Sequence, residues 1–214
     1  MSTRGDLGEG LAKCAFLLYF LGMNRNQLIE ALQILSIHSF LEEYVFDSVP
    51  HVFNGDRASY VGWKRSLGTA IDVDPACLTV VGSAAVGCSL NPVQNLKPFD
   101  EGSDVDVAVI SSYHFTVAWR YLRMNGARRL KVDTRTRIAW DDHVNRYIYW
   151  GTIATDKLLG VLPFGLEWLK AVGHMGAVDP TKGRDVNLRI YADYEALRAY
   201  QLMSVRNVRE SLYT

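Results

Sequence analysis

Two aspartates, Asp104 and Asp106, stand at the start of an apolar run that reads Val-Asp-Val-Ala-Val-Ile over residues 105–110. Alternate residues of a strand point to the same face, so the two carboxylates would project together while the valines face the other way. Neighbouring carboxylates repel each other unless a cation lies between them. Mg²⁺ binds hard oxygen ligands together with substrate phosphates. The pattern therefore predicts a metal site at Asp104 and Asp106.

A second feature lies about twenty residues earlier, where a predicted strand over residues 77–82 runs into Gly82 and Ser83. The residues that follow are small, with alanine at 84 and 85 and glycine at 87. Small residues let a phosphate approach the backbone closely, and the free N–H groups at the start of a helix favour anions. The turn is therefore a candidate phosphate site.

Together, Gly82, Ser83, Ser103, Asp104 and Asp106 resemble the Gly-Ser and Ser-Asp-x-Asp signature of the polymerase-β-like nucleotidyltransferase superfamily. The resemblance is close over residues 81–110 and holds only in outline elsewhere. It implies that Asp104 and Asp106 hold Mg²⁺ or Mn²⁺, and that Gly82, Ser83 and Ser103 bind the substrate, an NTP or a dNTP. It also implies an α+β fold with a small mixed sheet and flanking helices.

The superfamily usually carries a third carboxylate on a neighbouring strand. The segment Val-Asn-Leu-Arg-Ile over residues 186–190 resembles that strand, with Asn187 at the position of the acid. An amide can ligate a metal weakly but cannot act as a general base. Asp185 lies two residues earlier, on the same face of the strand, and is a possible substitute. Asp133 is the competing position, and we favour the alignment on Asn187.

We expect the helices and strands that position these residues to form a single compact unit over residues 1–214. Its parts are a helical segment 1–75, the motif core 76–126, a mostly helical segment 127–178, and a last strand with a closing helix over 179–214. Periodicity and caps predict helices over 9–23, 26–47 with Asn26 as its cap, 56–73, 112–124 and 194–212, and strands over 77–82, 104–110 and 186–191.

Composition limits the partners. The chain has 23 basic and 23 acidic residues and a formal net charge of zero, so tracking along a duplex is disfavoured and nucleic-acid contacts should be short and single-stranded. No apolar run approaches the length of a membrane span, and the first residues lack a signal-peptide pattern. We therefore expect a cytoplasmic protein without a membrane partner, either monomeric or oligomeric.

The resemblance implies metal-dependent transfer of a nucleoside monophosphate to a hydroxyl without a template. Small stand-alone bacterial members of this type resemble the Hailong anti-phage defence family, which is associated with single-stranded DNA synthesis from a protein tyrosine. Tyr213 lies one residue from the end of the sequence and is the acceptor that this resemblance suggests, with a nearby defence effector protein as partner.

Two alternatives remain at this stage. The chain could be a transferase that modifies tRNA or a small molecule, as toxin-like and antibiotic-modifying relatives do. It could also be a degraded nucleotide-binding regulatory module, an interpretation that Asn187 keeps open.

Overall fold

The computed structural model describes residues 23–213, so most of the helix expected over 9–23 lies outside the described residues. The described chain forms eight α-helices around a four-stranded mixed sheet in the order β1-β2-β4-β3. The strands are β1 (Leu78–Val81), β2 (Val105–Ile110), β3 (Thr152–Ala154) and β4 (Val186–Tyr191). β2 pairs with β1 antiparallel and with β4 parallel, and β3 pairs with β4 antiparallel. The expected α+β class is confirmed.

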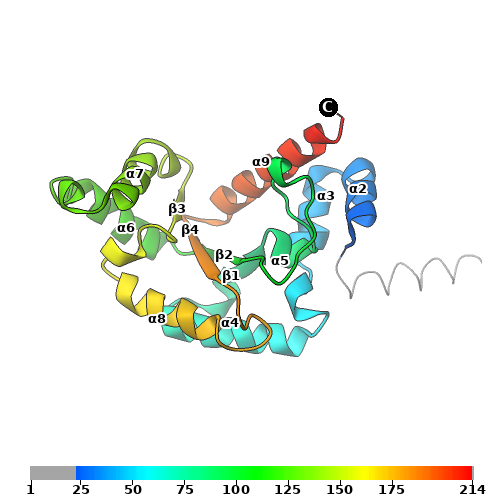
Figure 1. Ribbon diagram of the computed structural model, residues 1–214, viewed down its shortest axis with the longest axis horizontal. Helices are drawn as coiled ribbons and strands as arrows, with labels where there is room; N and C mark the ends of the chain where they lie inside the picture. Colours follow the sequence, from blue (N-terminus) through cyan, green and yellow to red (C-terminus); the bar gives the residue numbers. More distant parts are fainter. Residues whose placement is uncertain (1–22, 214) are drawn as a thin grey trace, which may run out of the picture.

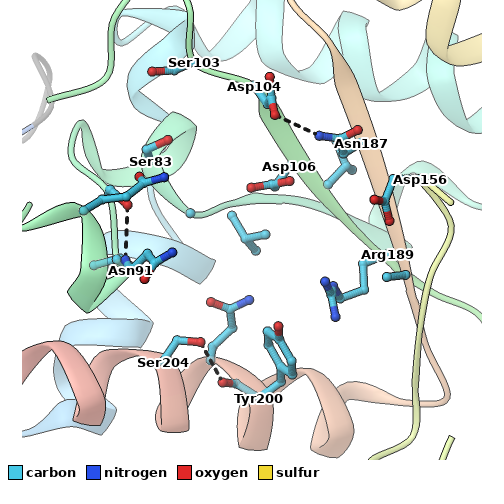
Figure 2. A pocket seen from close by; sticks show the side chains of 18 of the residues that line it. Ser83, Asn91, Ser103, Asp104, Asp106, Asp156, Asn187, Arg189, Tyr200 and Ser204 are labelled. Atoms are coloured by element: carbon cyan, nitrogen blue, oxygen red, sulfur yellow. Dashed lines mark hydrogen bonds between the residues drawn. The ribbon is translucent and has the colours of Figure 1, made fainter. Parts of the chain in front are cut away.

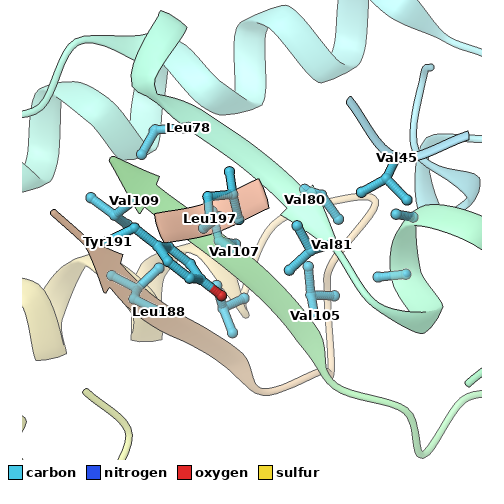
Figure 3. Packing of buried hydrophobic residues seen from close by; sticks show 14 of the residues in the cluster. Val45, Leu78, Val80, Val81, Val105, Val107, Val109, Leu188, Tyr191 and Leu197 are labelled. Carbon is cyan, nitrogen blue, oxygen red and sulfur yellow. The ribbon is translucent and has the colours of Figure 1, made fainter. Parts of the chain in front are cut away.

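One face of the sheet is apolar because every second residue of β2 and β4, beginning with Val105 and Val186, is apolar and points to that face. Val107 on β2 is the register partner of Val80 on β1 and of Leu188 on β4, and all three side chains are buried (Figure 3). On the opposite face, Asp106 is the register partner of Asn187. The period of two in strands thus places Asp106 and Asn187 opposite that core, while Ala108, Ile110 and Tyr191 on their face are buried.

The helices cover the sheet on both faces. In Figure 1, α4 (Arg57–Ile71) and α8 (Gly165–Met175) run along the apolar side, while α9 (Tyr194–Ser211) crosses the opposite side. The remaining α-helices are α2 (Arg25–Ile34), α3 (Ile37–Leu41), α5 (Ser83–Val86), α6 (Ser112–Met124) and α7 (Thr134–Asp142). Two π-helical turns, η1 (Glu42–Phe46) and η6 (His143–Tyr147), follow α3 and α7. The buried hydrophobic side chains form a single cluster.

Local caps explain where several helices begin, and they correct one prediction. The single helix expected over 26–47 with Asn26 as its cap is wrong. Asn24 caps α2, because its side chain accepts the N–H of Gln27 and the Gln27 side chain accepts the N–H of Asn24. The chain then leaves the helix at Leu35, and the Ser36 side chain caps a new helix, α3.

The segment 127–178 holds the larger departure, because it contains the strand β3 inside what we expected to be mostly helix. β3 adds to the edge of β4, with Ala154 opposite Arg189. Thr155 continues the pairing, since its N–H donates to the carbonyl of Leu188 at 3.1 Å, and Asp156 lies in the turn that follows. Within the described range, no helix is both long and apolar enough to cross a bilayer.

Candidate functional site

A cavity of about 440 Å³ opens over the face of the sheet that carries Asp106 and Asn187, between the turn before α5, the strands β2 and β4, and the helix α9 (Figure 2). It brings together residues far apart in the sequence. Those that concern its chemistry are Gly82, Ser83, Ser103, Asp104, Asp106, Asp156, Asn187, Arg189, Tyr200 and Ser204. We call this the first cavity.

Asp104, Asp106 and Asn187 form its centre. The Asn187 side-chain amide donates to Oδ2 of Asp104 at 3.3 Å. The pKa of the Asp106 carboxyl is raised, mainly because the surrounding protein removes part of its hydration and also because the carboxylates of Asp104 and Asp156 lie nearby. The guanidinium of Arg189 opposes this rise. The two aspartates are thus held close enough together to interact unfavourably.

Gly82 keeps the space beside Asp106 open. Its φ of 68° lies in the region that side-chain-bearing residues rarely adopt, and a Cβ built there would lie 3.3 Å from Oδ2 of Asp106. The backbone at residue 82 therefore passes directly against the carboxylate. A substrate that reaches Asp106 also meets this turn.

Ser83 begins α5, which is only four residues long. So short a helix has little macrodipole, and the anion site that we expected at a helix N-terminus loses that contribution. The anion-binding groups that remain are the Ser83 hydroxyl and the nearby backbone N–H groups. In the part of the chain that the structure describes, no hydrogen bond engages the Ser83 hydroxyl. The N–H groups of Ala85 and Val86 already donate to the carbonyl of Gly82, so the donors that remain for an anion are those of Ser83 and Ala84.

Ser103 lines the first cavity but holds the loop before β2. Its hydroxyl donates to Oδ1 of Asp100 at 2.8 Å and accepts the N–H of Asp100 at 3.0 Å. The Arg184 guanidinium fixes the same loop, since it donates to the carbonyls of Asp100 and Ser103 and lies 4.3 Å from the ring centroid of Phe99. These contacts fix the loop that leads directly into Asp104.

Arg189 supplies the positive charge. It lies on β4 two residues after Asn187, on the same face, and its guanidinium stacks on the rings of Tyr200 at 4.8 Å and Tyr147 at 5.8 Å. Its buried Nη1 has no acceptor among residues 23–213. The other cation that lines the first cavity, Lys97, is paired with Asp100 at 2.8 Å. Arg189 is the better placed of the two for an anionic ligand.

Asp156 is a site residue that sequence reasoning missed. It lies in the turn two residues beyond Ala154 and comes beside Asn187 and Arg189 (Figure 2). Its carboxylate raises the pKa of Asp106. The local sequence does not indicate a site at Asp156, because the strand before it has only three residues and shows no alternating pattern.

The other predicted positions lie apart from this centre. Asp185 lines a neighbouring cavity, and its carbonyl accepts the N–H of Val105. Asp133 is an N-cap, which accepts the N–H of Thr136 at the start of α7. Tyr213 follows the last turn of α9, is 67% exposed, and lines neither cavity.

The donor set suits a hard divalent ion. Within the described chain, no three Asp, Glu, His or Cys side chains are already gathered into a metal-binding group. Two carboxylates and one amide do meet at Asp104, Asp106 and Asn187, and Mg²⁺ is commonly held by one or two carboxylates with substrate phosphates completing its shell. The residues therefore fit an ion that arrives with a phosphorylated substrate.

Comparison with protein-family models, with curated proteins and with solved structures gave no match to this chain.

Proposed function

We propose that the protein is a metal-dependent nucleotidyltransferase that moves a nucleoside monophosphate from an NTP or dNTP to a hydroxyl. The observation that carries this proposal is the convergence of Asp104 and Asp106 with the open backbone of Gly82 in one cavity. The volume of about 440 Å³ falls within the range of small-ligand sites.

Each residue has a role in this proposal. Asp104 and Asp106 would hold Mg²⁺ or Mn²⁺, which neutralises charge on the triphosphate when bound. The Ser83 hydroxyl and the turn at Gly82 receive phosphate oxygens. Arg189 would place positive charge beside the same anion, and its guanidinium is held there by stacking on the ring of Tyr200, which also lines the cavity.

A nucleotide-binding regulatory module is the second candidate function. Asn187 favours it, because the register partner of Asp106 on β4 is an amide where an acid would complete a catalytic set. In such a module the same cavity would retain the nucleotide without turning it over.

Both candidate functions require a nucleotide to bind at Asp104 and Asp106, so a binding measurement tests both. Each of the four NTPs and four dNTPs is titrated with Mg²⁺, with Mn²⁺ and with EDTA, and heat of binding is measured. Asp104→Ala and Asp106→Asn should remove the metal-dependent part of the binding. Equal affinity in wild type and in both variants would exclude this site as the nucleotide site.

The glycine turn has a matched control. Gly82→Ala places a methyl group 3.3 Å from Asp106 and strains a backbone that favours glycine, at a cost of about 1–3 kcal/mol. We expect weaker nucleotide binding and lower stability. Gly62→Ala lies in α4 with no atom within 4 Å of its Cβ and should leave binding unchanged and stability equal or higher. Equal nucleotide affinity in the two variants would contradict a role for the turn.

A further inference from the structure

A second cavity, of about 430 Å³, adjoins the first. The two share Asp156, Asn187 and Leu188, which therefore lie where the two cavities meet. The second cavity lies between α8 and the segment that leads into β4. A ligand there would lie beside Asp156 and Asn187, on a side from which an attacking hydroxyl can approach a nucleotide in the first cavity.

The side chains that line the second cavity include three apolar ones and two carboxylates. Leu159, Leu169 and Val172 supply the apolar surface, and Leu169 on α8 is 45% exposed. The lining carboxylates are Asp156 and Asp185.

Among the residues that the structure describes, Arg184 is the only cation that lines the second cavity, and it is already bonded to the carbonyls of Asp100 and Ser103. A nucleic-acid strand needs lysine or arginine side chains for its phosphates. The arginines of α6 and α7, such as Arg123 and Arg135, line neither cavity. The charges of the second cavity therefore suit a neutral or amine-bearing molecule and oppose a polyanion.

A glycine keeps this cavity open. Gly173 lies inside α8, where glycine costs about 1 kcal/mol relative to alanine. No atom lies within 4 Å of a Cβ built at this position, so packing does not require glycine there. Gly173 also lines the second cavity, and any larger side chain would occupy its space.

From these observations we infer that the second cavity binds the acceptor, a sugar-sized alcohol that is neutral or carries amines, and that Asp156 takes its proton. This inference rests on the proposed function. The acceptor O–H gives its proton to the Asp156 carboxylate while its oxygen forms a bond to the α-phosphorus. The bond from the α-phosphorus to the bridging oxygen breaks, and pyrophosphate leaves with that electron pair.

The test incubates the protein with nucleotides labelled at the α-phosphate, Mg²⁺ or Mn²⁺, and three probes: glucose, glucosamine and an oligonucleotide with a free 3′-hydroxyl. Chromatography and denaturing gels separate label on sugar, on oligonucleotide and on the protein. We expect label on a sugar probe. Label on the oligonucleotide or on the protein overturns the acceptor proposal and leaves the proposed function standing.

Variants locate the acceptor. Gly173→Phe should abolish transfer to the sugar, while its matched control Gly62→Phe, also at an unobstructed helical glycine, should not. Asp156→Asn should lower kcat by about 100-fold or more, the scale of a lost general base. Nucleotide affinity in Gly173→Phe should match the wild type. Full transfer in Gly173→Phe or in Asp156→Asn overturns the proposal.

Two further outcomes distinguish failure of the acceptor proposal from failure of the proposed function. If the wild type binds no nucleotide, the proposed function fails. If it binds nucleotide in a metal-dependent way and labels none of the probes nor itself, the acceptor proposal is wrong and the regulatory-module alternative is supported.

Discussion

Asp106 lies where the fold makes ionisation costly. Loss of hydration and the nearby carboxylates of Asp104 and Asp156 raise its pKa, and Arg189 and Asn187 act in the opposite direction. A carboxylate placed this way destabilises the ligand-free protein, and a bound cation would relieve the repulsion. The cost is therefore consistent with a residue selected for binding.

Asp106→Asn should stabilise the ligand-free protein at neutral pH. The folded pKa lies above the unfolded one, so the penalty is absent below the unfolded pKa and develops as pH rises through the folded pKa. The gain in melting temperature of the variant should thus be largest at pH 7 and disappear in acid. Melting curves of wild type and variant from pH 3 to 8 measure this difference. A variant less stable than wild type at pH 7 would contradict the assigned environment of Asp106.

At the scale of elements, the strands with strong patterns were predictable and the short one was not. β1, β2 and β4 are runs of apolar or alternating residues, so their positions could be predicted within about a residue. β3 is Thr-Ile-Ala, which has no period to detect, and it exists because β4 offers it an edge. Asp156 escaped prediction with it, since its place depends on that pairing.

The end of β3 is also fixed by His143, a buried residue of η6. Its Nε2 accepts the N–H of Ala154 at 3.0 Å, and its Nδ1 bonds to the carbonyl of Ala139. An Nε2 that accepts a backbone N–H carries no proton, so the ring is neutral. Burial lowers the pKa of the His143 imidazole, against the opposing hydrogen bond to Ala139. β3, and with it the approach to Asp156, is therefore held by a neutral histidine.

This predicts a pH dependence of stability. The folded pKa of His143 lies below the unfolded value of 6.5, so its contribution is complete above pH 6.5 and is lost as pH falls through the folded pKa. His143→Gln, which cannot titrate, should be less stable than wild type at pH 8 and approach it in acid. Denaturant unfolding at several pH values measures the gap, and the protection of the Ala154 amide relative to its intrinsic exchange rate should fall in acid in the wild type. A gap that is independent of pH would contradict this role.

At the scale of the whole molecule, one hydrophobic cluster joins the helices before the sheet to those after it. A buried hydrogen bond ties the two parts together, from Nε1 of Trp63 in α4 to Oγ1 of Thr181 in the loop between α8 and β4. That loop continues to Arg184 and Asp185 at the second cavity. Packing far from the aspartates thus supports the surface that we assign to the acceptor.

Unfolding should therefore be a single cooperative transition, and a substitution at Trp63 should lower the midpoint of that whole transition. Trp63→Phe removes the bond to Thr181 and part of a buried ring, at a cost of about 1–3 kcal/mol. Since a domain of this size loses roughly 2–4 °C per kcal/mol, the midpoint should fall by several degrees. Circular dichroism and tryptophan fluorescence should move together, whereas Val93→Ala, at a side chain 91% exposed, should change neither. Two separate transitions, or a loss of fluorescence signal before helix content, would mean that the helices around the sheet unfold independently.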